Sequence, residues 1–314
     1  LILVLIVNEV RNGAVRTFLN GSIQPSELAN IVTIIYLSVW LFSKRDQLGD
    51  VGFGLFPLAA ILGFLFALIF LQPDLSAAMT ILFLGGMMFF LAGGELRQIL
   101  IVLVVALVIG FIIVQLTATG TNRMGLYLAG LKDPTQASYH VRRSVEAFVK
   151  GKWLGVGIGM SETKLTGLPY PSTDSIFAVI GEETGILGSV ALIALYVLLL
   201  WRGLTIARRA PDNLGTLLAG GLTLWIAMEA FINMAVMVNL MPFAGNALPF
   251  ISSGGSNLLV SFAAVGILMN ISRSSAQIRK EEGRLFSAVV DLRRRDRRRS
   301  VSGARGSSGP DFEG

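Results

Sequence analysis

The chain has 314 residues, of which 53% are hydrophobic and 15% are charged, and its formal net charge is +6. A soluble protein of this length has about a quarter of its residues charged, so the composition excludes an ordinary globular domain. The absence of cysteine excludes thiol chemistry, and a single histidine excludes a metal site built from several histidines. Several apolar stretches approach the ~20 residues that a helix needs to cross a membrane, and they lack the alternation of barrel strands. We therefore expect an all-α, polytopic membrane helix bundle.

Hydropathy and helix breakers predict eight apolar segments. In chain order they are Leu1–Val7 (part of a span), Ser26–Phe42, Gly54–Leu71, Leu75–Leu91, Leu96–Leu116, Ile176–Trp201, Leu214–Leu240 and Ser256–Ile271. We expect a membrane domain over 1–272 and a basic, disordered tail over 273–314, which ends in a Gly/Ser-rich stretch. Because the chain starts within an apolar stretch, we also expect that part of the native membrane domain precedes it.

Lysine and arginine in the short connections predict the orientation of the bundle. If the crossings alternate, the basic connections and the basic tail fall on one side, which we expect to be cytoplasmic. Their residues are Lys44, Arg45, Arg97, Arg202, Arg208, Arg209 and the tail arginines. We expect the tail to contact anionic lipids rather than nucleic acid. The one long connection, 117–175, then lies outside, and its aromatic residues indicate that it is partly ordered.

This long connection carries seven lysines and arginines against four aspartates and glutamates. Basic side chains pair with phosphate oxygens, so the excess suits a lipid pyrophosphate bound above the membrane. The candidate binding residues are Arg123, Arg142, Lys152 and Lys164. Contact with lipid headgroups explains the same charge almost equally well. The glycine run Gly155–Gly159 indicates nucleotide binding only weakly, because no strand is predicted before it.

Asp174 is the main catalytic candidate. It follows Pro171-Ser172-Thr173, where the outer connection enters an apolar helix. A carboxylate at a membrane boundary is costly to keep, and partial burial suits a general base. Helix capping alone explains an acid at this position at least as well. Further along the helix, we expect Glu182 and Glu183 to hydrogen-bond to a neighbouring helix.

Three more motifs combine proline with oxygen-bearing side chains at predicted helix starts on the outer side. They are Gln24-Pro25-Ser26-Glu27, Gln72-Pro73-Asp74-Leu75 and the run Leu248–Ser256. Helix initiation explains the first two. The third has irregular backbone, which is tolerated at membrane depth only where it lines a cavity or is buried in protein. The candidate cavity residues are Gln24, Glu27, Gln72, Asp74, Ser252, Ser253 and Ser256.

In this order, the motifs resemble the SEDS family (shape, elongation, division and sporulation), whose members include FtsW, RodA and SpoVE. The resemblance spans roughly residues 12–274 and includes Asn12-Gly13-Ala14 and Thr173-Asp174. It implies a fold of ten helices, of which about seven to eight are present here, with one long structured outer loop. The pattern of Gly157, Gly159, Ser161 and Lys164 resembles the division and sporulation branch more than RodA.

The resemblance implies an inverting glycosyltransferase that polymerises lipid II into peptidoglycan on the outer face of the plasma membrane, during cell division at the septum. Asp174 matches the family's essential aspartate and would deprotonate the acceptor sugar while undecaprenyl pyrophosphate leaves. A class B penicillin-binding protein and other division proteins are the implied partners. A divalent cation, Mg²⁺ or Mn²⁺, could share the pyrophosphate charge, with Asp174 as one ligand.

The sequence departs from the family pattern beside that aspartate. Tyr170, Ser172 and Ser175 stand where the family usually has Glu, His and Phe. The setting of the carboxylate therefore differs from the family's, which bears on the exact tuning of the site more than on the reaction class. Three alternatives remain open: a lipid II flippase or other transporter, a division scaffold without activity, and a RodA-like elongation enzyme.

Overall fold

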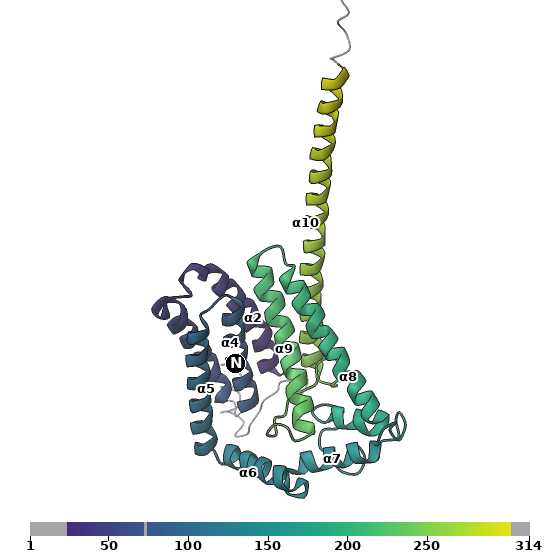
Figure 1. Ribbon diagram of the computed structural model, residues 1–314. Helices are drawn as coiled ribbons and strands as arrows, with labels where there is room; N and C mark the ends of the chain where they lie inside the picture. Colours follow the sequence, from purple (N-terminus) through teal and green to yellow (C-terminus); the bar gives the residue numbers. More distant parts are fainter. Residues whose placement is uncertain (1–23, 72–73, 303–314) are drawn as a thin grey trace, which may run out of the picture.

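The computed structural model describes residues 24–71 and 74–302 (Figure 1). The predicted half-span Leu1–Val7, the Asn12-Gly13-Ala14 motif, Gln72 and residues 303–314 lie outside the described residues. Within the described ranges the secondary structure is helical, without strands. The expected all-α membrane bundle with a long structured outer loop is confirmed.

The predicted apolar segments that fall in the described ranges are all helices. Their bounds are α2 (Pro25–Ser43), α3 (Phe56–Phe70), α4 (Leu75–Leu91), α5 (Leu96–Leu116), α8 (Ile176–Arg208), α9 (Asn213–Met237) and α10 (Gly255–Ser302). Short helical turns, η2 (Arg45–Gln47) and η3 (Val51–Leu55), join α2 to α3. Among the described residues, five stretches are long and apolar enough to cross a membrane, or six if Leu100–Leu116 and Ala118–Lys132, which meet at an angle of 100°, are counted as one bent span. The chain is therefore a multi-pass membrane protein.

The long outer connection contains two helices that lie across one end of the bundle (Figure 1). They are α6 (Ala118–Lys132) and α7 (Tyr139–Gly151), with the turn η4 (Pro134–Gln136) between them. Hydroxyl groups cap both helices: Thr117 accepts from the amide of Gly120, and Ser138 accepts from the amide of Val141. Helix α7 packs against the start of α8, where Gly151 and Gly181 bring the two backbones together.

The helix α10 continues far beyond the predicted span and extends away from the bundle (Figure 1). We expected disorder from residue 273, whereas the backbone is helical to Ser302. The reason lies in the composition of this stretch, which has no proline and contains nine arginines among its thirty residues, and arginine is a strong helix former.

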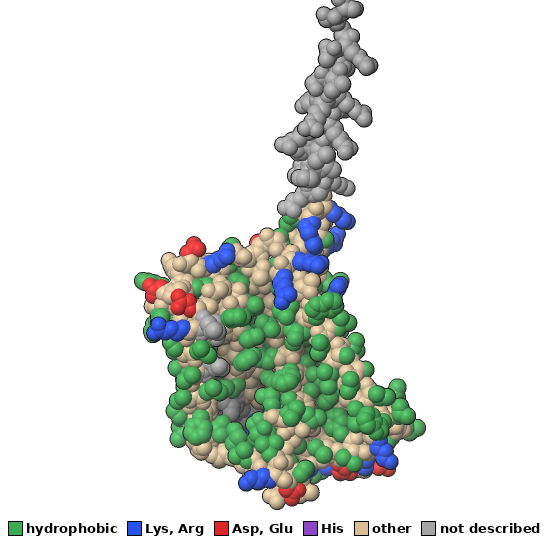
Figure 2. Space-filling view, in the orientation of Figure 1, with side chains coloured by type: hydrophobic (Ala, Val, Ile, Leu, Met, Phe, Trp, Pro, Cys, Tyr) green, Lys and Arg blue, Asp and Glu red, His purple; other side chains and the backbone are tan. Residues whose placement is uncertain are grey.

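Charged side chains gather at the two ends of the bundle. Figure 2 shows apolar side chains over the middle of the molecule and charged side chains of both signs at either end, with Lys and Arg more numerous at the upper end. We call this upper end the basic end; α2, α4 and α8 finish there, at Ser43, Leu91 and Arg208 (Figure 1). The opposite end, which carries α6 and α7, is the site end. Between them, α2, α4 and α9 bury a core that includes Ile34, Met88 and Trp225.

Candidate active site

Asp174 lies half-buried at the site end, just before α8 begins. The loop between α9 and α10 holds the backbone in front of it. Ser253 donates to the carbonyl oxygen of Ser172 through its amide and its hydroxyl, both at 2.9 Å. Ser252 Oγ donates to the carbonyl oxygen of Thr173 at 2.7 Å. The serines that the sequence marked as cavity residues thus fix the segment that carries the carboxylate.

Asn233 supplies the next hydrogen bond in this series. Its side chain is buried in α9, and Nδ2 donates to the carbonyl oxygens of Asp174 (2.8 Å) and Asn246 (2.6 Å). The loop also runs close to the carboxylate, since a methyl group on Gly245 would lie 3.0 Å from Asp174 Oδ2. Our sequence reasoning missed Asn233, although an amide inside an apolar helix is itself a signal of a polar contact.

The outer motifs meet beside this loop. The amide of Gln24 donates to Ser256 Oγ at 3.2 Å, and Ser256 Oγ donates to Glu27. The side chain of Gln24 donates to Asp74 Oδ2 at 3.2 Å, while Asp74 Oδ1 caps α4. Glu27 lies within electrostatic range of both Asp74 and Asp174. Segments far apart in the sequence therefore build one acidic site.

A small polar cavity lies among these motifs, between α2, α4, α9 and the α9–α10 loop. We call it the polar chamber; its volume of about 30 Å³ is enough for one or two water molecules. Its lining includes Glu27, Asp74 and Glu229, together with the amides of Asn30 and Asn257. Glu229 is buried and accepts hydrogen bonds from Asn30 Nδ2 (3.2 Å) and from the indole of α9's Trp225, at 2.8 Å. Carboxyl and amide groups therefore line a small polar cavity inside an otherwise apolar bundle.

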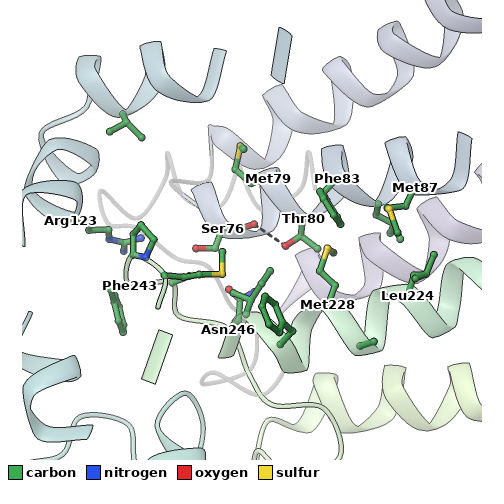
Figure 3. Close-up of a pocket in the computed structure, with 18 of the residues that line it drawn as sticks. Ser76, Met79, Thr80, Phe83, Met87, Arg123, Leu224, Met228, Phe243 and Asn246 are labelled. Carbon is green, nitrogen blue, oxygen red and sulfur yellow. Dashed lines mark hydrogen bonds between the residues drawn. The ribbon is translucent and has the colours of Figure 1, made fainter. Parts of the chain in front are cut away.

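A second, much larger cavity is apolar. We call it the groove; it has a volume of about 720 Å³ and is lined mainly by α4, α9 and the α9–α10 loop. Methionine and phenylalanine side chains cover its walls, among them Met79, Phe83 and Met228 (Figure 3). Arg123 lies at one end, and Asn246 lines both the groove and the polar chamber. The groove therefore ends beside the loop that contacts Asp174.

Aromatic rings join Arg123 to the Asp174 segment. The guanidinium carbon of Arg123 lies 5.6 Å from the ring centre of Phe243, whose ring in turn lies 4.4 Å from that of His140. His140 Nδ1 is 3.4 Å from Ser175 Oγ, and this hydroxyl donates to the carbonyl oxygen of Pro169. Burial lowers the pKa of His140, so the imidazole is neutral at pH 7. The only histidine therefore packs beside the site as an uncharged ring.

Of the four predicted phosphate-binding residues, only Arg123 lines the groove. Arg142 is exposed on α7, where Nη1 donates to the carbonyl oxygen of Thr135 at 3.3 Å. Lys152 is exposed directly after α7. Lys164 forms an ion pair with Glu183, with 2.6 Å between Nζ and Oε1. The structure thus brings Arg123 toward the acidic site and leaves the other three on the connection before α8.

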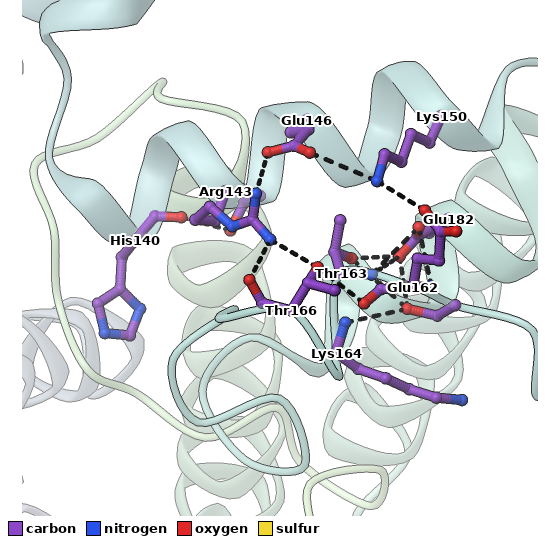
Figure 4. A network of polar contacts seen from close by, with 11 residues as sticks. His140, Arg143, Glu146, Lys150, Glu162, Thr163, Lys164, Thr166 and Glu182 are labelled. Carbon is purple, nitrogen blue, oxygen red and sulfur yellow. Dashed lines mark hydrogen bonds and ion pairs between the residues drawn. The ribbon is translucent and has the colours of Figure 1, made fainter.

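That connection has its own polar network (Figure 4). Glu182 is buried and accepts hydrogen bonds from the hydroxyls of Ser161 and Thr163. Nearby, a hydrogen bond to Glu162 raises the pKa of Lys150. We expected the glutamates of α8 to bond to a neighbouring helix, and this is wrong, since Glu182 and Glu183 both bond to the outer connection. The network therefore holds the connection against α8.

The sequence and the fold of the chain are similar to those of known proteins. Residues 1–277 match the cell cycle protein family FtsW/RodA/SpoVE. The chain is 39% identical to the probable peptidoglycan glycosyltransferase FtsW of Geobacter sp. (strain M18) over 249 residues, which cover 79% of this chain and 68% of the relative. It is 36% identical to stage V sporulation protein E of Bacillus subtilis (strain 168) over 281 residues, 88% of this chain and 76% of that one. The chain thus spans about two thirds to three quarters of the length of these relatives.

Two solved structures share the fold. The first is described as the structural coordination of polymerization and crosslinking by a peptidoglycan synthase complex; it matches with a TM-score of 0.68 at 24% identity and covers 88% of this chain and 80% of its own. The second is the rod shape determining protein RodA of Thermus thermophilus, with a TM-score of 0.57 at 23% identity over 87% and 76% of the two chains.

Proposed function

Because this chain belongs to the FtsW/RodA/SpoVE family, as its motifs predicted, we propose that it is a peptidoglycan glycosyltransferase of cell division. Its likeness to relatives named FtsW supports the division branch. In this proposal it polymerises lipid II on the outer face of the plasma membrane, at the division septum. One observation carries the proposal: Asp174 is half-buried against the α9–α10 loop at Gly245, and this loop lines the polar chamber through Gly245 and Asn246 and the groove through Asn246.

The proposed reaction uses Asp174 as the general base. Its carboxylate accepts the proton of the acceptor's 4-hydroxyl, and the oxygen attacks the anomeric carbon of the growing chain. The new C–O bond forms on the face opposite the pyrophosphate, so the configuration inverts. Undecaprenyl pyrophosphate leaves with the electrons of the broken bond. The hydrogen bonds to the backbone at Ser172, Thr173 and Asp174 support this role, because a base must be held at a fixed distance from the proton that it takes.

The groove suits the lipid part of the substrate. An apolar cavity of about 720 Å³ can shield a polyprenyl tail from water. Arg123, at the end of the groove, is placed to pair with the pyrophosphate. Arg142, Lys152 and Lys164 line neither cavity and stay predictions from the sequence.

A divalent cation is also part of the proposal. In the described part of the chain, no three histidine or acidic side chains converge as metal ligands. Mg²⁺ is commonly held by one or two carboxylates together with substrate phosphates. Asp174 and the pyrophosphate would therefore be the ligands of Mg²⁺ or Mn²⁺, which would neutralise charge on the leaving group.

The proposed partner is a class B penicillin-binding protein that crosslinks the new strands, together with other division proteins. The likeness to a chain of a structure described as a peptidoglycan synthase complex supports such a partner.

The test is polymerisation of labelled lipid II by the purified protein with its partner synthase. Asp174→Ala and Asp174→Asn should lower the rate by a factor of about 10²–10⁴, the usual contribution of a general base. Asp133→Asn is the matched control, because Asp133 is an outer carboxylate that caps a helical turn away from both cavities. Chromatographic elution and unfolding temperature should be unchanged in all three variants.

Two results would contradict the proposal. Polymer formed equally well without the Asp174 carboxylate would remove this residue from the mechanism. No polymer from the unchanged protein, under conditions in which a related enzyme works, would favour a scaffold or a transporter.

A further inference from the structure

The connection between α7 and α8 exposes a group of large apolar side chains. We call Trp153, Leu154, Val156, Ile158 and Met160 the apolar tip; four of them are 68%, 78%, 86% and 71% exposed, with Val156 lower at 44%. A contiguous apolar surface of this kind marks a contact with another molecule or with a membrane. No member of the tip lines the groove or the polar chamber. The proposed reaction therefore does not account for it.

The tip is fixed to α8 by its backbone. Four hydrogen bonds of 2.9–3.3 Å join residues 152–157 to residues 182–187. These hydrogen bonds satisfy backbone amide and carbonyl groups of α8 that lose their partners within the helix at Gly185, where the helix breaks with φ of +70°. The approach is so close that a methyl group on Gly155 would lie 2.1 Å from the carbonyl oxygen of Glu183. The backbone of residues 152–157, which carries Trp153, Leu154 and Val156, is thus held firmly against the break in α8.

The break lies next to the membrane-facing surface of α8. Directly after it, Ile186, Leu187, Val190 and Ile193 are 40–56% exposed. Figure 1 places the start of α8 and the connection before it at the lower right of the molecule. In Figure 2 apolar side chains cover this corner and continue up α8, and charged side chains follow the lower edge beneath. The tip therefore continues the apolar surface of α8. It lies above the charged lower edge, on the side of the membrane-facing surface.

We propose that the apolar tip inserts into the outer leaflet of the membrane, at the boundary between headgroups and acyl chains. Tryptophan is enriched at this boundary, and the exposed Lys152 beside Trp153 can reach lipid phosphates with its ammonium group. The amides of Val156 and Gly157 are already paired with α8, so insertion places neither of them unpaired in lipid. The proposal goes beyond the proposed reaction and does not depend on it.

A protein partner would also cover apolar side chains. The lipid is favoured because the tip is continuous with the exposed apolar face of a membrane-crossing helix and starts with the Lys-Trp pair of a membrane boundary. Insertion would also stabilise the short first part of α8, which begins at Ile176, two residues after Asp174.

The chain contains no cysteine, so single cysteines can be placed and labelled with a nitroxide. Leu154→Cys and Ile158→Cys probe the tip, and Val190→Cys is the reference for the lipid-facing surface of α8. Glu162→Cys is the matched control in the same connection, since its side chain is 75% exposed among charged groups. Each labelled protein is placed in phosphatidylcholine nanodiscs, and collisions are measured with oxygen, which concentrates in lipid, and with a water-soluble nickel chelate.

If the tip is inserted, labels at 154 and 158 should behave like the label at 190 and collide more often with oxygen than with the nickel chelate. The label at 162 should collide more often with the nickel chelate. The proposal would be overturned if labels at 154 and 158 collided with the nickel chelate as often as the label at 162 does. Exclusion of both reagents would also overturn it, because the tip would then be covered by protein. The unfolding temperature of each labelled variant confirms that it is folded.

Discussion

The environment of Asp174 depends on donors from other elements. Ser252, Ser253 and Asn233 hold three consecutive backbone carbonyls through hydrogen bonds of 2.7–2.9 Å. None of these donors needs to touch a substrate to matter. A carboxylate that takes a proton in the transition state works only at a fixed distance, and small displacements are costly in rate.

Asn233→Ala should lower kcat and leave the KM for the lipid substrate nearly unchanged. The substitution leaves two carbonyl oxygens, of Asp174 and Asn246, without their donor, which costs about 1–3 kcal/mol for a buried group. The freed segment would then hold the base less accurately, while the groove remains intact. Steady-state polymerisation rates over a range of lipid II concentrations measure both constants.

Thr223→Ala is the control for Asn233→Ala. Thr223 is equally buried in α9, but its hydroxyl bonds within its own helix, to Ala219, far from the site. Thr223→Ala should therefore change the stability of the fold and leave kcat unchanged. If both variants lose kcat to the same degree per folded protein, Asn233 has no positioning role.

The residues of the site were only partly predictable. Asp174, Glu27 and Asp74 stand out because acids at the ends of apolar segments are rare and costly. Asn233 could have been singled out as an amide inside an apolar helix, but its partners could not, because a hydrogen bond to a distant backbone carbonyl leaves no pattern in the sequence. Lys164 stood out as a basic residue, but its ion pair with Glu183 was not predictable, because the two residues meet only when the connection folds against α8.

At the scale of elements, helix α8 shows how a local break organises the outer connection. Hydropathy and helix breakers predicted one continuous apolar segment from Ile176 to Trp201. Gly181 packs against Phe148 of α7, whereas Gly185 has a non-helical backbone and contacts the connection at Trp153 and Gly155. The break could not be read from the sequence, because a glycine in an apolar helix equally suits packing.

Gly155→Ala and Gly159→Ala form a matched pair that tests this contact. Both glycines have a left-handed backbone, with φ of +80° and +84°. An added methyl group would meet the carbonyl of Glu183 at position 155, but nothing within 4 Å at position 159. Gly159→Ala should therefore cost only the backbone strain of about 1–2 kcal/mol, and Gly155→Ala clearly more.

Thermal unfolding in detergent, followed by tryptophan fluorescence, compares the two variants. Trp153 lies in the contact and should report its loss early in Gly155→Ala. Equal unfolding temperatures would show that backbone strain alone decides both substitutions and that the contact adds little.

At the scale of the whole molecule, charge and hydropathy were sufficient to predict the layout. The helices alternate in direction, the described lysines and arginines of the short connections gather at one end, and the long connection lies at the other (Figures 1 and 2). The groove was not located by the sequence. It forms where α4 and α9 meet the α9–α10 loop, and its methionines and phenylalanines are indistinguishable in the sequence from lipid-facing residues.

The groove leads to the last prediction, which concerns the length of the lipid tail. Ala227 lines the groove, so Ala227→Trp would fill part of it with an indole ring. Each buried methylene contributes ~0.8 kcal/mol, and tenfold in affinity corresponds to ~1.4 kcal/mol. Displacing as few as two methylenes should thus raise the KM for undecaprenyl-linked substrate about tenfold. A substrate with a short tail, which leaves most of the groove empty, should keep its KM.

Ala194→Trp provides the comparison, because Ala194 is exposed on α8 and lines neither cavity. Its KM should match that of the unchanged protein with both substrates. A dependence on tail length that appears in Ala227→Trp and not in Ala194→Trp would place the tail in the groove. If Ala227→Trp raised the KM of both substrates equally, the effect would come from a distorted site, and the tail would have to lie elsewhere on the bundle.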